Sequence, residues 1–233
     1  MFERLKMTHH WEGKMEPFRI VGNVYFVGTY PASSHLIDTG AGLILIDTGY
    51  ADTLFMVVDS IHRLGFDPMD IKYIINTHWH GDHTAGTAAL AGFTGAKTLI
   101  GWQDAEKAKQ YFTPDILVHD GDILTLGNTK ISFMETPGHT KGTISFFLDT
   151  EEGGKTYRVG SFGGAGANTL AQGKTASLTA PCGEVFWTTV KSVWMPLLQR
   201  RIKYEICKLS FAFHFFRRPV YPGAAVGCIA NTV

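Results

Sequence analysis

The chain has 233 residues, 45% of them hydrophobic, and its 21 Lys and Arg residues balance its 21 Asp and Glu residues. This length supports one sizeable core, while the balanced charge argues against a nucleic acid or an anionic membrane as partner, because both require a clustered positive field. No apolar run is long enough to span a bilayer, residues 1–10 lack the apolar core of a signal peptide, and three cysteines are too few for a disulfide scaffold, so we expect a cytoplasmic protein.

Short apolar runs rich in β-branched and aromatic residues recur between Gly, Asp and Pro signals and predict buried strands. Helical patterns alternate with them. The clearest covers residues 52–64, where apolar side chains recur with the spacing of one helix face. Weaker patterns predict helices over residues 84–91, which Gly86 interrupts, and over residues 103–111. Strands in a meander, followed by strands that alternate with helices, indicate an α/β fold in which helices cover sheets. The predicted strands are residues 24–28, 43–46, 73–75, 131–133 and 144–148.

A cluster of metal-binding side chains follows the strand predicted at residues 73–75. His78, His80, Asp82 and His83 place three imidazoles and a carboxylate within six residues. Alternate residues leaving a strand point to the same side, so His78 and His80 can face one site, while Asp82 and His83 lie at the turn into the next helix. A single histidine is usually an ordinary packed residue, but this crowding indicates a site for Zn²⁺, which binds imidazole and carboxylate.

A fourth histidine follows another predicted strand. His139 lies in the run Thr-Pro-Gly-His-Thr of residues 136–140, where Pro137 fixes one backbone angle and Gly138 permits an unusual one. Alone this is a weak signal. Together with His78 and His80 it completes a set of three histidines, a type of zinc site that leaves one tetrahedral position open for water.

Three motifs resemble the metallo-β-lactamase superfamily of metal-dependent hydrolases: Leu-Ile-Asp-Thr-Gly at 45–49, His-Trp-His-Gly-Asp-His at 78–83 and Thr-Pro-Gly-His-Thr at 136–140. The resemblance covers residues 17–171 and is greatest for the third subclass, whose zinc ligands are histidines and one aspartate. It implies an α/β fold of the αββα sandwich type, with the metals at one edge. By the same resemblance His78, His80 and His139 hold a first zinc, and Asp82 and His83 begin a second site. Asp47 either supports the loops around the metals or is a plain turn residue.

Two departures from the family pattern affect the functional expectation. Thioesterases and lactonases of the superfamily usually carry an Asp that bridges both metals after the strand following the Thr-Pro-Gly-His turn, but residues 157–168 contain no acidic residue. This absence favours the β-lactamase-like subclass. The second zinc also needs a further histidine near the C-terminus, where only His214 is available, in an aromatic cluster. His214 and Cys182 are both more typical of packed residues than of ligands, so we expect one zinc and an incomplete second site.

The end of the chain differs in composition from the rest. Residues 172–233 contain 8 basic and 2 acidic residues, no Asp and all three cysteines, whereas residues 1–171 contain 13 basic and 19 acidic residues. We therefore expect a metallo-β-lactamase-like domain over residues 1–171 and an atypical basic tail over residues 172–233. A frame change or fusion near Gln172 would explain how this tail replaced the end of the domain and left the C-terminal part of the sandwich incomplete or altered.

The expected chemistry is metal-assisted hydrolysis of a small-molecule substrate. Zn²⁺ held by three neutral histidines lowers the pKa of bound water toward about 7, which supplies hydroxide to attack a carbonyl, and Asp82 would orient that hydroxide as the catalytic residue. The resemblance implies cleavage of a β-lactam, an activity that confers antibiotic resistance, or of a related cyclic amide or ester. Two alternatives stay open: a metal-binding protein made catalytically silent by its tail, and a thioesterase or lactonase of the same superfamily.

Overall fold

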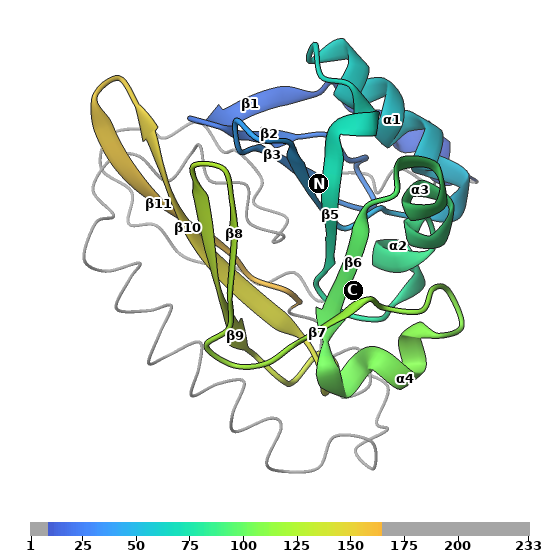
Figure 1. Cartoon of the computed structure of the whole chain (residues 1–233). Helices are drawn as coiled ribbons and strands as arrows, with labels where there is room; N and C mark the ends of the chain where they lie inside the picture. Colours follow the sequence, from blue (N-terminus) through green and yellow to red (C-terminus); the bar gives the residue numbers. More distant parts are fainter. Residues whose placement is uncertain (1–8, 165–233) are drawn as a thin grey trace, which may run out of the picture.

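Two β-sheets pack face to face over residues 9–164, the part of the chain that the computed structural model describes. Figure 1 shows the two sheets as layers that converge at one end, with helices beyond the larger sheet. The larger sheet has seven strands in the order β1 to β7. These strands are β1 (Phe18–Val21), β2 (Val24–Phe26), β3 (His35–Asp38), β4 (Leu43–Ile46), β5 (Ile71–Asn76), β6 (Lys97–Gly101) and β7 (Ile116–Val118).

The larger sheet changes from antiparallel to parallel at β4. Strands β1 to β4 form an antiparallel meander, whereas β4 to β7 are parallel neighbours. The carboxyl ends of parallel strands meet at one edge of a sheet, and this edge is where α/β proteins place their ligand sites. The loops that follow β4, β5 and β6 therefore lie side by side.

The smaller sheet has four antiparallel strands in the order β11-β10-β9-β8. Its inward face is made by alternate residues of each strand. Opposed pairs such as Phe133 with Phe146 lie between the two sheets, together with Ile131 and Leu148. The strands are β8 (Ile123–Leu126), β9 (Thr129–Glu135), β10 (Ile144–Glu152) and β11 (Lys155–Ser161).

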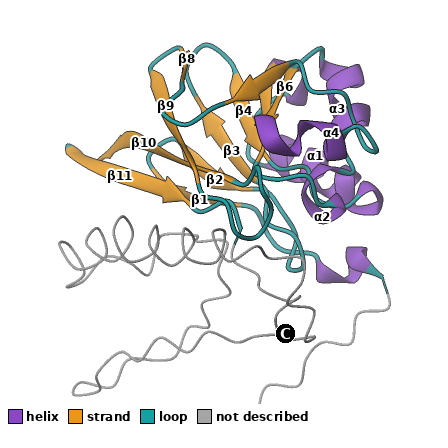
Figure 2. Cartoon of the chain, turned by 90° about the horizontal axis from the view of Figure 1, so that it is seen from below, coloured by secondary structure: helices purple, strands orange, loops and turns teal. Residues whose placement is uncertain are grey.

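The helices are short, and the α-helices lie on the side of the larger sheet (Figure 2). Val57 and Ile61 of α1 and Leu90 of α3 belong to a core that lies between these helices and the outer face of the larger sheet. Over the described residues no helix lies on the outer face of the smaller sheet. The α-helices are α1 (Leu54–Arg63), α2 (Gly81–Thr84), α3 (Thr87–Thr94) and α4 (Ala105–Ala108), and the 3-10 turns are η1 (His10–Gly13), η2 (Ala51–Thr53), η3 (Pro68–Asp70) and η4 (Trp102–Asp104).

Strand β4 is buried on both faces, which explains its uninterrupted apolar sequence Leu-Ile-Leu-Ile. Ile44 and Ile46 belong to the core between the two sheets, while Leu43 and Leu45 belong to the core under α1 and α3. The α/β sandwich expected from the sequence is thus confirmed in these layers.

The helix predicted over residues 52–64 is present as η2 and α1, and its predicted apolar face packs on the sheet. The helical pattern over 84–91, interrupted at Gly86, is observed as two separate helices, α2 and α3, on either side of Gly86, and α3 continues to Thr94. A Cβ at Gly86 would lie 3.0 Å from Leu54 Cδ1 and 3.2 Å from Thr48 Cβ, so these two residues leave little room for a side chain at this position. The helix predicted over 103–111 is shorter and consists of η4 and α4.

The expectation of an atypical basic tail over residues 172–233 lies outside the described residues. Within the described part of the chain, no helix combines the length and apolar character needed to cross a bilayer.

Replacing Leu45 by Ala should destabilise the protein strongly, because this side chain of β4 is fully buried in the core between the larger sheet and the helices α1 and α3. We expect a loss of about 2 to 5 kcal/mol in the free energy of unfolding, measured by urea denaturation followed by circular dichroism. Leu117→Ala is the matched control, since Leu117 is 45% exposed on the edge strand β7 and its truncation should cost less than about 0.5 kcal/mol. Equal losses in the two variants would contradict this packing.

Candidate metal centre

Three loops meet at the carboxyl end of the parallel strands. One follows β4 and carries Asp47, one follows β5 and carries His78 and His80, and one joins β9 to β10 and carries His139. A backbone hydrogen bond of 2.9 Å from Ile144 N–H to the Thr77 carbonyl joins the last two loops. The site is therefore built from both sheets, although its residues are far apart in the sequence.

Three imidazoles converge in this place. His80 Nδ1 lies 3.0 Å from His139 Nε2, which in turn lies 3.1 Å from His78 Nε2. The rings of each pair are nearly perpendicular, so nitrogen atoms rather than ring faces point to the common centre. Zn–N bonds of roughly 2.0 to 2.1 Å in a tetrahedral site imply nitrogens about 3.3 Å apart, so the spacing fits a metal ion of this kind.

The tautomer of His78 is fixed by its surroundings. Its Nδ1 donates a hydrogen bond to the Gly163 carbonyl at 2.9 Å, which leaves the lone pair of Nε2 free to face the other two histidines. Such a bond to the outer nitrogen is the usual way in which a metal-binding histidine is oriented. His78 is only 1% exposed, so neither nitrogen depends on bulk water.

His78 and His80 are held in the neutral form that can bind a metal. Burial and the neighbouring imidazoles keep the pKa of His78 well below its ordinary value. Burial, followed by the proximity of His139, lowers the pKa of His80 to about 4. At neutral pH each of these two rings thus offers a lone pair rather than a second proton.

A second cluster contains His78, Asp82 and His83, whose ligand atoms lie within 4.8 Å of one another. His83 Nδ1 donates to the Asp47 carboxylate at 2.7 Å, and its Nε2 lies 3.5 Å from Asp82 Oδ2. Burial disfavours the charged form of His83, but the Asp47 carboxylate outweighs this effect and the pKa of His83 is raised. The structure thus places all five sequence-predicted ligands in two adjoining clusters, whereas His214 and Cys182 lie outside the described residues.

Asp47 is a supporting residue of this site rather than a plain turn residue. Its two oxygens accept hydrogen bonds of 2.8 Å from the Thr77 N–H and the Thr77 hydroxyl, in addition to the bond from His83. Among the described non-glycine residues it alone has a positive φ, of 56°. Asp tolerates this conformation better than most side chains do, so the residue type suits both the turn and the bonds.

The loop after β11 closes the site with glycines. Gly163 accepts the bond from His78, and Gly164 lies against the His139 ring, where an added Cβ would come within 2.6 Å of His139 Cδ2. Over its described residues, 157–164, the segment expected from the resemblance to carry a bridging carboxylate in thioesterases and lactonases contains no carboxylate.

Asp104 was not predicted from the sequence, although it contacts both histidine loops. Its carboxylate is 1% exposed and accepts hydrogen bonds from the Trp79 N–H, the Thr140 hydroxyl and the Gly142 N–H. Burial raises the pKa of Asp104, and these hydrogen bonds oppose that rise. The available signal was an acidic residue soon after the buried strand β6, which alone is too common to indicate a site.

Trp79, between His78 and His80 in the sequence, packs against the small core of Ile100 and Phe112, and its ring lies beside the His80 ring.

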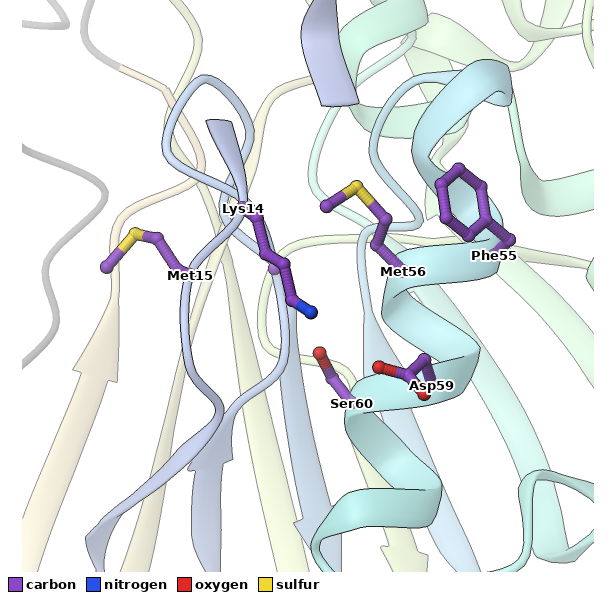
Figure 3. Close-up of a pocket in the computed structure, with 7 residues that line it drawn as sticks. Lys14, Met15, Phe55, Met56, Asp59 and Ser60 are labelled. Carbon is purple, nitrogen blue, oxygen red and sulfur yellow. The ribbon is translucent and has the colours of Figure 1, made fainter. Parts of the chain in front are cut away.

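A cavity of about 220 Å³ lies away from the histidines, between Lys14 and Met15 of the N-terminal segment and helix α1 (Figure 3). None of the clustered histidines lines it.

Fold and site together define an α/β sandwich with a histidine-rich candidate metal centre. Residues 27–173 match the family model of the metallo-beta-lactamase superfamily, and the chain belongs to this superfamily. A beta-lactamase from Chitinophaga pinensis is 31% identical, with a TM-score of 0.70 over 82% of this chain and 78% of that one. A subclass B3 metallo-beta-lactamase of Bradyrhizobium japonicum is 27% identical, with a TM-score of 0.64 over 82% of this chain and 96% of that one. The predicted resemblance to the third, histidine-rich subclass is thereby confirmed.

A different kind of relative appears among curated proteins. An N-acyl homoserine lactonase of Bacillus thuringiensis is 29% identical over 156 residues, which cover 53% of this chain. The chain spans 60% of the length of this lactonase. Both β-lactamases and lactonases are therefore similar to this protein.

Asp47→Ala should destabilise the metal-free protein by about 2 to 4 kcal/mol, because His83 and Thr77 would lose a buried acceptor and Ala tolerates a positive φ poorly. Urea denaturation after treatment with a chelator measures this loss. Asp149→Ala, at an exposed position of β10, is the control and should change stability by less than about 0.5 kcal/mol. An Asp47→Ala variant as stable as the control would contradict the supporting role.

Proposed function

We propose that this chain is a zinc-dependent hydrolase that opens the ring of a β-lactam or a related cyclic amide or ester. The observation that carries the proposal is the convergence of His78, His80 and His139 nitrogens at distances of 3.0 and 3.1 Å. Three neutral imidazoles suit Zn²⁺ better than the hard cations Mg²⁺ and Ca²⁺, which prefer oxygen ligands. A zinc ion supplies a Lewis acid that polarises a carbonyl and makes water nucleophilic at neutral pH.

The protein's own residues would then hold and orient the reactants. His78, His80 and His139 would bind the ion, with His78 kept in the required tautomer by the Gly163 carbonyl. Asp82, whose side chain is 38% exposed beside His83, can accept a hydrogen bond from the attacking water and orient it toward the carbonyl. Asp82 and His83 would also contribute to a second metal ion if one binds.

The choice of a β-lactam as first substrate rests on two observations. The structural relatives named above are β-lactamases, including one of subclass B3. In addition, Gly163 and Gly164 provide backbone atoms, and no carboxylate, next to His78 and His139. This supports a site of the histidine-rich β-lactamase type.

A lactone is the second candidate substrate, because a curated relative is an N-acyl homoserine lactonase. Both rings present a carbonyl to the same nucleophile, so the histidine site alone does not favour either. A thioesterase and a protein that binds zinc without turnover are the other two possibilities, and the assays below separate all four.

Metal analysis and turnover assays test this function. The full chain, prepared without added zinc, should contain about one zinc per chain if the second site is incomplete and about two if it is complete. It should hydrolyse a chromogenic cephalosporin, and a chelator should abolish this activity. His139→Ala should lose most of the zinc and at least about 100-fold in kcat/KM, whereas His62→Ala, at an exposed position of α1, should behave as the wild type.

Each other result has a defined meaning. Cleavage of an acyl homoserine lactone with the cephalosporin left intact would identify the second candidate, and cleavage of a thioester alone would identify a thioesterase. Zinc bound without hydrolysis of any of the three substrates would indicate a catalytically silent protein. A wild-type chain that binds no divalent ion would refute the proposal as a whole.

A further inference from the structure

Asp104 bonds to both of the loops that carry the candidate zinc ligands. Its Oδ2 accepts from the Trp79 N–H at 3.2 Å and from the Thr140 hydroxyl at 2.5 Å, and its Oδ1 accepts from the Gly142 N–H at 2.9 Å. Trp79 lies between His78 and His80 in the chain, and Thr140 directly follows His139. One buried carboxylate thus contacts the immediate sequence neighbours of all three histidines.

The Asp104 carboxylate does not cap the helix that follows it. Asp104 occupies the N-cap position of α4, where an Asp side chain ordinarily accepts a hydrogen bond from the first turn, but here it makes no such bond. All three donors belong instead to the two histidine loops. A buried carboxylate is costly to desolvate, so its acceptor sites are expected to be satisfied, and here these loops satisfy them.

The loop of His139 is fitted closely around this carboxylate. A Cβ at Gly142 would lie 2.4 Å from Asp104 N and 2.8 Å from Asp104 Cβ, so only glycine allows this approach. Thr140 is also held by Thr143, whose hydroxyl accepts from the Thr140 N–H at 3.0 Å and lies 2.7 Å from the Thr140 hydroxyl. The turn is therefore bonded within itself, and Asp104 connects it to the loop after β5.

We propose that Asp104 is a positioning residue, which sets the separation of His80 and His139 by tying their loops to one carboxylate. This inference rests on the proposed function, since it assumes that these histidines bind a metal. Asp104 makes no direct contact with the ion in this role. Its loss should loosen the ligand geometry without removing any ligand.

The first test compares metal binding by the full chain and by two Asp→Asn variants. Asp104→Asn replaces one acceptor oxygen by an N–H₂ group that faces donors, so the affinity for Zn²⁺, measured by competition with a chromophoric chelator, should fall by roughly 10- to 100-fold. The visible absorption of the Co²⁺-loaded variant should also change, because this spectrum reports ligand geometry. Asp115→Asn is the matched control: Asp115 accepts from the N–H and the hydroxyl of Thr98, both at 2.9 Å, but contacts neither histidine loop.

A second pair of variants keeps the test decisive if Asp104→Asn does not fold. Thr140→Val removes the hydroxyl that donates to Asp104 but preserves the shape of the side chain, whereas Thr140→Ser retains the hydroxyl. We expect Thr140→Val to lose Zn²⁺ affinity and Thr140→Ser to recover most of it. Hydrogen exchange at the Trp79 and Gly142 amides of the metal-free protein should also be faster in Asp104→Asn than in Asp115→Asn.

The outcomes distinguish this inference from the proposed function. If the wild type binds zinc and Asp104→Asn binds it with the same affinity and the same Co²⁺ spectrum, Asp104 does not position the ligands, although the zinc site stands. Equal losses of affinity in Asp104→Asn and Asp115→Asn would also refute the specific role. A wild type that binds no metal would overturn both proposals.

Discussion

The site depends on keeping three imidazoles uncharged and close together. His139 Nε2 lies 3.0 Å from a nitrogen of His80 and 3.1 Å from a nitrogen of His78 in a partly buried place, where protonated rings would repel one another. Burial and mutual proximity lower the pKa values of His78 and His80, so repulsion between cations is avoided at neutral pH. A metal site also requires the correct geometry. The two loops, which come from different sheets, must be held at a fixed separation so that the lone pairs of their histidine nitrogens point to one place.

The loop after β5 is held from both sides by carboxylates. Asp47, after β4, accepts from the Thr77 N–H, and Asp104, after β6, accepts from the Trp79 N–H. The two backbone amides that flank His78 are thus bonded to acidic residues supplied by the neighbouring strands. The parallel order β4-β5-β6 makes this possible, because it brings three carboxyl ends together along one edge. The fold contributes the arrangement, and short polar contacts then fix the position of each histidine.

Sequence reasoning could find most of the candidate metal ligands because four of them lie within six residues of the chain, whereas the supporting contacts join distant segments. The spacing of His78, His80, Asp82 and His83 indicates a metal site without any knowledge of tertiary structure, and alternation in the apolar runs indicates which strands are buried. Asp104 could not be identified in this way, since its three partners come from segments 25 to 38 positions away. The interruption at Gly86 is visible in the sequence because glycine is a poor helix former, but the close approach of Leu54 and Thr48 to this position is visible only in the structure.

The two glycines that close the site restrict how this chain could evolve. Gly164 lies so near the His139 ring that a methyl group already exceeds the space available, and a Cβ at Gly163 would lie 1.9 Å from the Ile144 carbonyl oxygen. A single substitution to an acidic residue at either position would therefore collide with the existing structure instead of adding a ligand. Acquiring a carboxylate there would require the main chain to move away from the histidines first. At these two positions, therefore, a bridging aspartate could be acquired only together with a change of backbone, which point mutation alone rarely supplies.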